Sequence, residues 1–213
     1  MTPPHTLLRL GVLISGGGST LANLIERLGD GRLRGVRIVA VVSSRGAVRG
    51  AEIARQAGLS LAIVRRRDHA DADGFSRAVA ASLDAAEVDL AAMGGFLCHW
   101  RLPTRYASRT LNIHPALLPA FGGRGMHGRR VHEAVLTSGA TESGCTVHLV
   151  DEIYDHGPIL AQRRVRVAPG DTPESLAARV GQAERELYPR VIQRVADEGV
   201  SILTDAHAWR DFA

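Results

Sequence analysis

Residues 110–119 read Thr-Leu-Asn-Ile-His-Pro-Ala-Leu-Leu-Pro, and this stretch decides how the rest of the chain is interpreted. Its apolar and polar residues first alternate as in a short β-strand, so Asn112 and His114 share one face of that strand. Pro115 ends the strand because proline has no N–H to donate, and Pro119 constrains the loop that follows. We therefore expect both polar side chains at the carboxyl end of a strand, where α/β proteins bind their ligands.

The chemistry of these side chains suits acyl transfer. An amide can donate a hydrogen bond to a developing oxyanion, and an imidazole can take up or release a proton near neutral pH. A carboxylate would complete the site, and we assign that role to Asp155, which lies in a loop between two strand-like segments. The same residues also fit a purely structural role, in which Asn112 and His114 cap a strand and Asp155 belongs to a turn.

The length and composition indicate a soluble globular protein. Its 213 residues, of which 45% are hydrophobic and 23% charged, fit one domain spanning residues 1–213. No apolar stretch approaches the roughly 18 residues of a membrane span, and residues 1–13 lack the pattern of a signal peptide. We therefore expect a cytoplasmic protein with no membrane partner.

The charged residues exclude several classes of protein. All 26 basic residues are arginine, so Schiff-base chemistry, pyridoxal phosphate attachment and P-loop ATPases, which all need lysine, are excluded. The net charge of +4 could attract nucleic acid, but the arginines are scattered and aromatic residues make up only 4% of the chain. We expect small-molecule partners and no nucleic acid, and both a monomer and a homodimer remain open.

The cysteines and histidines give no metal pattern. Cys98 and Cys145 are far apart in the sequence, and none of the nine histidines joins them in a zinc-like spacing. We expect neither a disulfide nor a metal site.

Short apolar segments alternate with helical patterns through the first half of the chain, as is typical of parallel βαβ units. Two further strand-like segments flank the Asp155 loop, and we expect them to pair antiparallel at the sheet edge. A capped helical pattern runs from Thr172 to Gly199, and we expect Pro189 to split or bend it. The predicted fold is a doubly wound, Rossmann-like α/β fold with a mostly parallel sheet and an antiparallel edge. The expected strands cover residues 10–14, 36–43, 61–64, 88–93, 110–114, 145–150 and 159–167.

Residues 15–20, Ser-Gly-Gly-Gly-Ser-Thr, connect the first expected strand to a helical pattern. Glycines let backbone N–H groups approach an anion, and the helix dipole favours negative charge at the helix start. The segment therefore predicts a phosphate cradle, although a tight turn would have the same composition.

Several short motifs occur in an order and spacing that are highly specific for one family. They are Ile14-Ser15-Gly16-Gly17-Gly18-Ser19, Gly95-Phe96, Leu111-Asn112-Ile113-His114-Pro115-Ala116-Leu117-Leu118-Pro119, Gly144-Cys145-Thr146-Val147-His148, Asp155-His156-Gly157-Pro158 and Glu184. With these motifs the chain resembles the phosphoribosylglycinamide formyltransferases, folate-dependent enzymes of purine synthesis, over nearly its full length. The resemblance implies the formyltransferase fold and transfer of a formyl group from 10-formyltetrahydrofolate to 5-phosphoribosylglycinamide.

The resemblance also implies a role for individual residues. The N-terminal half of the chain would hold the phosphate of the ribonucleotide, and the C-terminal half would hold the folate and the catalytic residues Asn112, His114 and Asp155. The residues implied to bind the ribonucleotide are Gly18, Ser19, Thr20, Gly95, Pro115 and Glu184, the last through the ribose hydroxyls. Those implied to bind the folate, a consumed cosubstrate and not a tightly bound cofactor, are Phe96, Leu97, Cys98, Val150, Asp151, Glu152 and Gly157, and His148 is implied to support the catalytic groups.

The expected mechanism combines an oxyanion donor with a proton relay. Asn112 and protonated His114 would stabilise the tetrahedral oxyanion, while Asp155 would orient His114, raise its pKa and relay the proton. Residues 120–128 contain four glycines, which predicts a mobile lid beside this site.

Other functions remain open at this stage. Formyltetrahydrofolate deformylase and the other folate-dependent formyltransferases share the Asn, His and Asp residues. A catalytically silent nucleotide-binding module would use only the glycine segment, but the presence of Asn112, His114 and Asp155 together argues against it.

Overall fold

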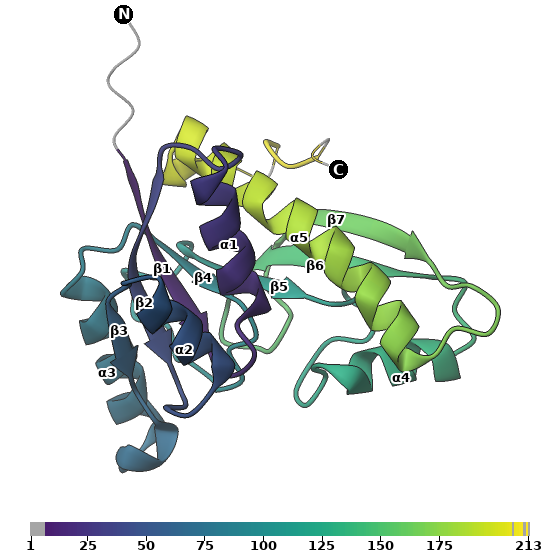
Figure 1. Ribbon diagram of the computed structural model, residues 1–213, viewed down its shortest axis with the longest axis horizontal. Helices are drawn as coiled ribbons and strands as arrows, with labels where there is room; N and C mark the ends of the chain where they lie inside the picture. Colours follow the sequence, from purple (N-terminus) through teal and green to yellow (C-terminus); the bar gives the residue numbers. More distant parts are fainter. Residues whose placement is uncertain (1–6, 206, 211, 213) are drawn as a thin grey trace, which may run out of the picture.

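The computed structural model describes residues 7–205, 207–210 and 212. Its strands form one mixed sheet in the order β3-β2-β1-β4-β5-β6-β7, with helices on both faces (Figure 1). Strands β1 to β5 pair in parallel, whereas β6 runs antiparallel to both β5 and β7. The predicted doubly wound fold with an antiparallel edge is confirmed.

The parallel strands are apolar because helices cover both of their faces. The strands at Val36–Ser43 and Thr110–His114 have their predicted bounds, and the other five differ from prediction by up to three residues at their ends. The bounds are β1 Leu8–Ile14, β2 Val36–Ser43, β3 Leu61–Ile63, β4 Leu90–Met93, β5 Thr110–His114, β6 Glu142–Leu149 and β7 Ile159–Arg166.

The sheet divides the core into two apolar clusters, one on each of its faces. One cluster joins α1, α5 and the sheet, and its members include Leu21, Leu24 and Leu187. The other is covered by α3, through Phe75 and Val79. The helices are α1 Ser19–Gly29, α2 Arg49–Gln56, α3 Ala72–Asp84, α4 Arg129–Thr137 and α5 Pro173–Glu198, with short 3-10 turns at Arg66–Asp68 and Val200–Thr204.

Helix α5 crosses β6 and β7, and its first turns lie beside α4 (Figure 1). Its start matches the predicted cap, because Thr172 and Ser175 exchange hydrogen bonds in a capping box. Of the two effects predicted for Pro189, a split is wrong, since the helix continues to Glu198, and a bend stays a prediction. Pro189 cannot donate to the carbonyl of Arg185, but that carbonyl accepts a hydrogen bond of 3.0 Å from Nδ2 of Asn23 in α1. A side chain from a distant helix therefore replaces the missing backbone donor.

The strand order reverses between β1 and β4, because the chain leaves β1 towards β2 on one side and returns to β4 on the other. Parallel sheets bind ligands outside the carboxyl ends of the strands at such a point. The two strand ends are tied together: Gly94 N–H donates to the Leu13 carbonyl at 3.0 Å, and Leu97 N–H donates to Ser15 Oγ at 2.9 Å. The fold thus fixes the geometry of the edge where the site was predicted.

Candidate active site

A cleft of about 850 Å³ opens at this edge of the sheet. It brings together residues from the ends of β1, β4 and β5, the loop after β5, the loop before β7 and the starts of α1, α4 and α5. The predicted site residues that line it are Gly18, Ser19, Thr20, Gly95, Phe96, Leu97, Asn112, His114, Pro115, Asp155 and Glu184. Segments up to 168 residues apart in the sequence, such as Gly16 and Glu184, therefore share one cavity.

The remaining residues predicted to contact the folate lie outside the cleft wall, and their contact with folate stays a prediction. Two of these residues, Asp151 and Gly157, shape the loop that carries Asp155. Asp151 accepts hydrogen bonds from Ile153 N–H and from the imidazole of His156. A Cβ on Gly157 would lie 1.9 Å from the Leu149 carbonyl oxygen, so only glycine fits there. The predicted residues outside the wall are Cys98, Val150, Asp151, Glu152 and Gly157.

The glycine segment forms an open helix start, as an anion site requires. Gly18 precedes α1 in a left-handed conformation with φ of 72°, and no side chain caps the helix. A Cβ on Gly18 would lie 2.4 Å from Cα of Gly50, and one on Gly94 would lie 2.6 Å from Cβ of Thr20. These close approaches pack the segment firmly while leaving its N–H groups uncapped, and no acidic residue occupies the first turn of α1.

The catalytic trio predicted from the sequence is assembled in the structure. Asn112 Nδ2 lies 3.4 Å from Asp155 Oδ1, and His114 Nδ1 lies 3.4 Å from Asp155 Oδ2. His148, opposite Asn112 on β6, places its Nε2 3.0 Å from Asn112 Nδ2 and 3.6 Å from Asp155 Oδ1. The two histidines and the amide therefore surround one carboxylate.

Backbone carbonyls fix the tautomers of both histidines, because a carbonyl oxygen can only accept a hydrogen bond. His114 Nε2 donates to the carbonyl of Phe121 at 2.9 Å, which leaves Nδ1 as an acceptor facing Asp155. His148 Nδ1 donates to the Leu149 carbonyl at 2.7 Å, which leaves Nε2 to accept from Asn112. One Asn112 hydrogen is thus engaged by His148, and the other makes only the longer contact with Asp155.

The expected pKa of His114 is wrong in direction. His114 is 3% exposed, and burial lowers its pKa below the ordinary value despite the nearby Asp155 carboxylate, which acts to raise it. Burial acts to raise the pKa of Asp155, but hydrogen bonding, including that from the Gly123 N–H, holds it below its ordinary value. The resting cleft therefore holds a neutral imidazole beside an ionised carboxylate.

Loop backbone from both sides holds Asp155 in place. The Gly123 N–H donates to Asp155 Oδ2 at 3.0 Å, and Asp155 itself has a φ of 54°, which is unusual for a residue other than glycine. Phe121, whose carbonyl orients His114, also has a positive φ of 57°. Such strained positions cluster at functional sites, where the surrounding structure holds them.

Glu184 faces the same cleft from α5 and has no hydrogen bond or ion pair among the described residues. Burial raises the pKa of its carboxyl to about 7, and nearby Arg185 only partly offsets this. An unpartnered carboxyl in a cleft can accept hydrogen bonds from ligand hydroxyls.

Sequence reasoning missed several residues of the cleft wall. Along α5, the face that carries Glu184 also presents Gly181, Ala177 and Pro173, which recur at helical spacing and could have been found from Glu184 alone. Those on the loop fall in the glycine-rich segment 120–128, which was predicted to lie beside the site. Those at the start of α4 had no comparable signal, because their position depends on how α4 packs against α5. These further residues are Gly123, Arg124, Gly125, Met126, His127, Gly128, Arg129 and His132.

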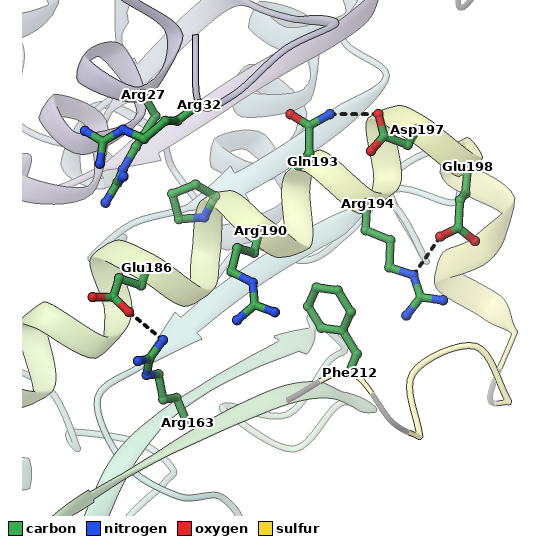
Figure 2. Close-up of a pocket in the computed structure, with 11 residues that line it drawn as sticks. Arg27, Arg32, Arg163, Glu186, Arg190, Gln193, Arg194, Asp197, Glu198 and Phe212 are labelled. Carbon is green, nitrogen blue, oxygen red and sulfur yellow. Dashed lines mark hydrogen bonds and ion pairs between the residues drawn. The ribbon is translucent and has the colours of Figure 1, made fainter. Parts of the chain in front are cut away.

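A second hollow, of about 570 Å³, lies over the later turns of α5 (Figure 2). Arg163 pairs with Glu186 at 2.5 Å, and Arg194 pairs with Glu198 at 2.8 Å. Arg190 lies over the ring of Phe212. Carboxylates and an aromatic ring already engage these arginines, and none of the catalytic trio lines the hollow. The cleft at the strand ends is therefore the candidate active site.

The described residues form neither a metal site nor a membrane-spanning helix. No group of three or more His, Cys, Asp or Glu side chains in that part of the chain is arranged to hold a metal ion. None of the helices described is both long and apolar enough to cross a membrane.

The fold and this site define a class of protein. Residues 8–192 match the sequence profile of the family described as Formyl transferase, and the chain belongs to that family. The family implies a folate-type formyl donor as cosubstrate.

The relatives make the comparison more specific. The chain is 42% identical over 206 residues to the chloroplastic phosphoribosylglycinamide formyltransferase of Arabidopsis thaliana, covering 95% of this chain and 68% of that protein. It is 42% identical over 204 residues to the phosphoribosylglycinamide formyltransferase of Mycobacterium tuberculosis, covering 94% and 91%. The crystal structure of glycinamide ribonucleotide transformylase 1 from Symbiobacterium toebii matches with a TM-score of 0.84 at 37% identity, covering 91% and 89%. The family resemblance predicted from the motifs is confirmed.

Proposed function

We propose that the protein transfers the formyl group of 10-formyltetrahydrofolate to the primary amine of 5-phosphoribosylglycinamide, in purine biosynthesis. The observation that carries this proposal is the assembly of Asn112, His114 and Asp155 around one point of a cleft that also contains an uncapped helix start. The names of the relatives in Arabidopsis and Mycobacterium support the same substrate.

The two substrates would meet at the trio from opposite sides. The glycine segment and Glu184 lie on one side, where the helix start suits a phosphate and the unpartnered carboxyl suits ribose hydroxyls. Leu97, which is 40% exposed, and Tyr154 also line the cleft and offer apolar surface to the pteridine. Phe96 also lines the cleft, but its ring packs against Phe75 in the core.

The reaction needs a group that takes up one proton and returns it. Attack of the amine on the formyl carbon forms the new C–N bond, and collapse of the tetrahedral intermediate breaks the bond to N10 of the folate. His114 Nδ1 and Asp155 Oδ2 face each other as two acceptors, so the pair can take the proton from the attacking nitrogen and deliver it to N10. His114 becomes cationic only after that uptake, when the oxyanion needs stabilisation.

Asn112 supplies the oxyanion donor. One of its hydrogens is held by His148 at 3.0 Å, while the contact to Asp155, at 3.4 Å, is long for a hydrogen bond. The loosely held hydrogen is the one available to the oxyanion. Loss of such a donor costs about 10²–10³ in rate.

Purified protein tests this proposal in a spectrophotometric assay with 10-formyltetrahydrofolate, with and without phosphoribosylglycinamide. Consumption of the folate that requires the ribonucleotide and yields its N-formyl product supports the transferase. Release of formate without the amine would replace it with a deformylase. Tight ribonucleotide binding with no folate consumption would replace it with a binding module.

The remaining properties of the protein follow from this function. We propose that it works in the cytoplasm on small molecules, without nucleic acid, membrane or a tightly bound cofactor. Residues 1–213 would act as one formyltransferase domain, either as a monomer or in a homodimer.

A further inference from the structure

The ribonucleotide substrate is a phosphate monoester, and the glycine segment meets it only with neutral groups. Backbone N–H groups and the hydroxyls of Ser19 and Thr20 are the donors available there. The chain contains no lysine, and the arginines among the described residues that line the cleft are Arg124 and Arg129. Arg124 lies close enough to Tyr154 to act on its pKa, which places it on the side proposed for the pteridine.

Arg129 stands at a second open helix start. It is the first residue of α4, a helix of nine residues preceded by Gly128 with φ of 58°, and no side chain caps this start and no acidic residue occupies its first turn. One carboxylate already holds Nε of Arg129, because Glu133 pairs with it at 2.6 Å within α4. Glu174 in the first turn of α5 forms a second ion pair, with Nη1 of Arg129. Both side chains are more than 60% exposed, so the pair is weak and open to exchange with another anion.

His132, one turn further along α4, gives an independent sign of a missing ligand. Its side chain is 4% exposed and lines the cleft, yet its buried Nδ1 has no hydrogen-bond partner. Buried polar atoms in folded proteins are nearly always paired, so an orphan of this kind points to a ligand or water.

Helix α5 connects the two helix starts on one side of the cleft. Asn23 of α1 binds α5 at the Arg185 carbonyl, next to Glu184, and Arg129 of α4 binds α5 at Glu174. These points are 11 residues apart on α5, or about 16 Å along the helix. Between them α5 presents only the small residues Ala177 and Gly181, which leave room for a ligand.

We infer that Arg129, with the start of α4 and His132, is the cationic half of the phosphate site and exchanges Glu174 for the phosphate of the ribonucleotide. This inference rests on the proposed function and identifies Arg129 as a residue that positions the substrate. Arg129 takes no part in the transfer of the formyl group, so its removal should weaken binding and leave the chemical step intact.

The test compares Arg129→Gln with Arg130→Gln, the neighbouring exposed arginine that does not line the cleft. Loss of one charged hydrogen-bond partner should raise KM for the ribonucleotide about tenfold, with kcat nearly unchanged. The Arg130→Gln variant should behave as wild type. With the dephosphorylated riboside, Arg129→Gln and wild-type protein should have equal affinity, because no phosphate remains for Arg129 to bind.

Glu174→Gln should change KM for the ribonucleotide in the opposite direction, because it removes the carboxylate that competes with the phosphate for Arg129. It should lower KM for the ribonucleotide several-fold, whereas an increase in KM would make the ion pair a structural link and overturn the exchange. Equal KM values for Arg129→Gln and Arg130→Gln would overturn the inference. A rise in KM for the folate alone would assign Arg129 to the folate carboxylates instead.

The formyl-transfer assay tests the proposed function, and a binding measurement tests the role of Arg129 independently of it. If wild-type protein shows no formyl transfer, that proposal fails, and calorimetric titration with the ribonucleotide still measures the Arg129 effect on binding. Thermal unfolding of each variant excludes loss of folding as the cause of a raised KM.

Discussion

Nδ1 of His114 and Oδ2 of Asp155 lie 3.4 Å apart, and both are acceptors in the resting cleft. The only hydrogen of neutral His114 is engaged by the Phe121 carbonyl. Burial acts to raise the pKa of Asp155, but hydrogen bonding, including that from the Gly123 N–H, holds it below its ordinary value. His114 Nδ1 and Asp155 Oδ2 therefore face each other with no hydrogen between them. The pair is therefore prepared to receive a proton from the attacking amine.

Asp155→Asn should remove this proton acceptor while preserving the fold. Asparagine tolerates the positive φ of 54° at this position, so the backbone need not change. We expect kcat to fall by about a hundredfold or more, because an amide cannot relay the proton. Ribonucleotide affinity, measured by calorimetry, should stay near the wild-type value. Unfolding, or loss of that affinity, would instead make Asp155 a structural residue.

The buried His132 should make the protein sensitive to acid. Burial and the nearby His114 lower its pKa, so the unfolded chain takes up a proton below about pH 6.5 while the folded chain still resists it. Stability is therefore present above this pH and is lost as the pH falls. The drop in Tm from pH 7.5 to pH 5.5 should be smaller in His132→Gln than in wild-type protein.

The exposed His207 provides the control for this measurement. His207→Gln should retain the wild-type dependence of Tm on pH. If His132→Gln also retains it, the cost of protonating His132 does not contribute to acid unfolding.

The sequence was sufficient to predict the sheet, which depends on local patterns, and the proximity of Asn112, His114 and Asp155, whose catalytic role stays a prediction. The alternation in residues 110–114 places Asn112 and His114 on one face, and the strand register then sets His148 opposite Asn112. The pKa of His114 could not be predicted in the same way. Its sign depends on how deeply the fold buries the ring, and burial outweighs the carboxylate that the sequence did reveal.

Two other features depend on contacts between distant segments. Helix α5 continues through Pro189 because Asn23, 162 residues before Arg185, hydrogen-bonds the carbonyl that proline leaves free. Arg129 reaches the cleft only because α4 packs beside the first turns of α5. No pattern within either segment carries this information.

Thr146 is expected to hold the loop that orients His114. Its buried Oγ1 donates to the Ala116 carbonyl at 2.7 Å and accepts from the Leu118 N–H at 3.0 Å. Thr146→Val keeps the shape but leaves both groups unpaired, which should cost about 1–3 kcal/mol of stability. We also expect a lower kcat, since the same loop carries the Phe121 carbonyl.

Urea unfolding and steady-state kinetics measure these two effects. Thr141→Val, at an exposed position before β6, is the matched control and should change neither. Wild-type stability in Thr146→Val would show that its hydrogen bonds do not support the loop.

The ionised carboxylate of Glu184 should lower the stability of the protein while it strengthens ribonucleotide binding. Its pKa is raised from 4.5 to about 7 by burial, so its folded form favours the neutral acid. This contribution to stability is complete below pH 4.5 and is lost as the pH rises through 7, at a cost on the order of 3 kcal/mol as an upper limit. Glu184→Gln should therefore raise Tm relative to wild-type protein at pH 8 and have little effect at pH 5.

The same substitution should weaken ribonucleotide binding, because an amide cannot accept two ribose hydroxyls as a carboxylate does. We expect KM for the ribonucleotide to rise about tenfold. Glu186→Gln, two residues further along α5 and paired with Arg163 at the surface, should change neither KM nor the pH dependence of Tm. A Glu184→Gln variant that is stabilised at pH 8 and binds normally would mean that the ribose lies elsewhere. A variant that binds weakly without being stabilised would mean that solvent reaches the carboxylate in the free protein.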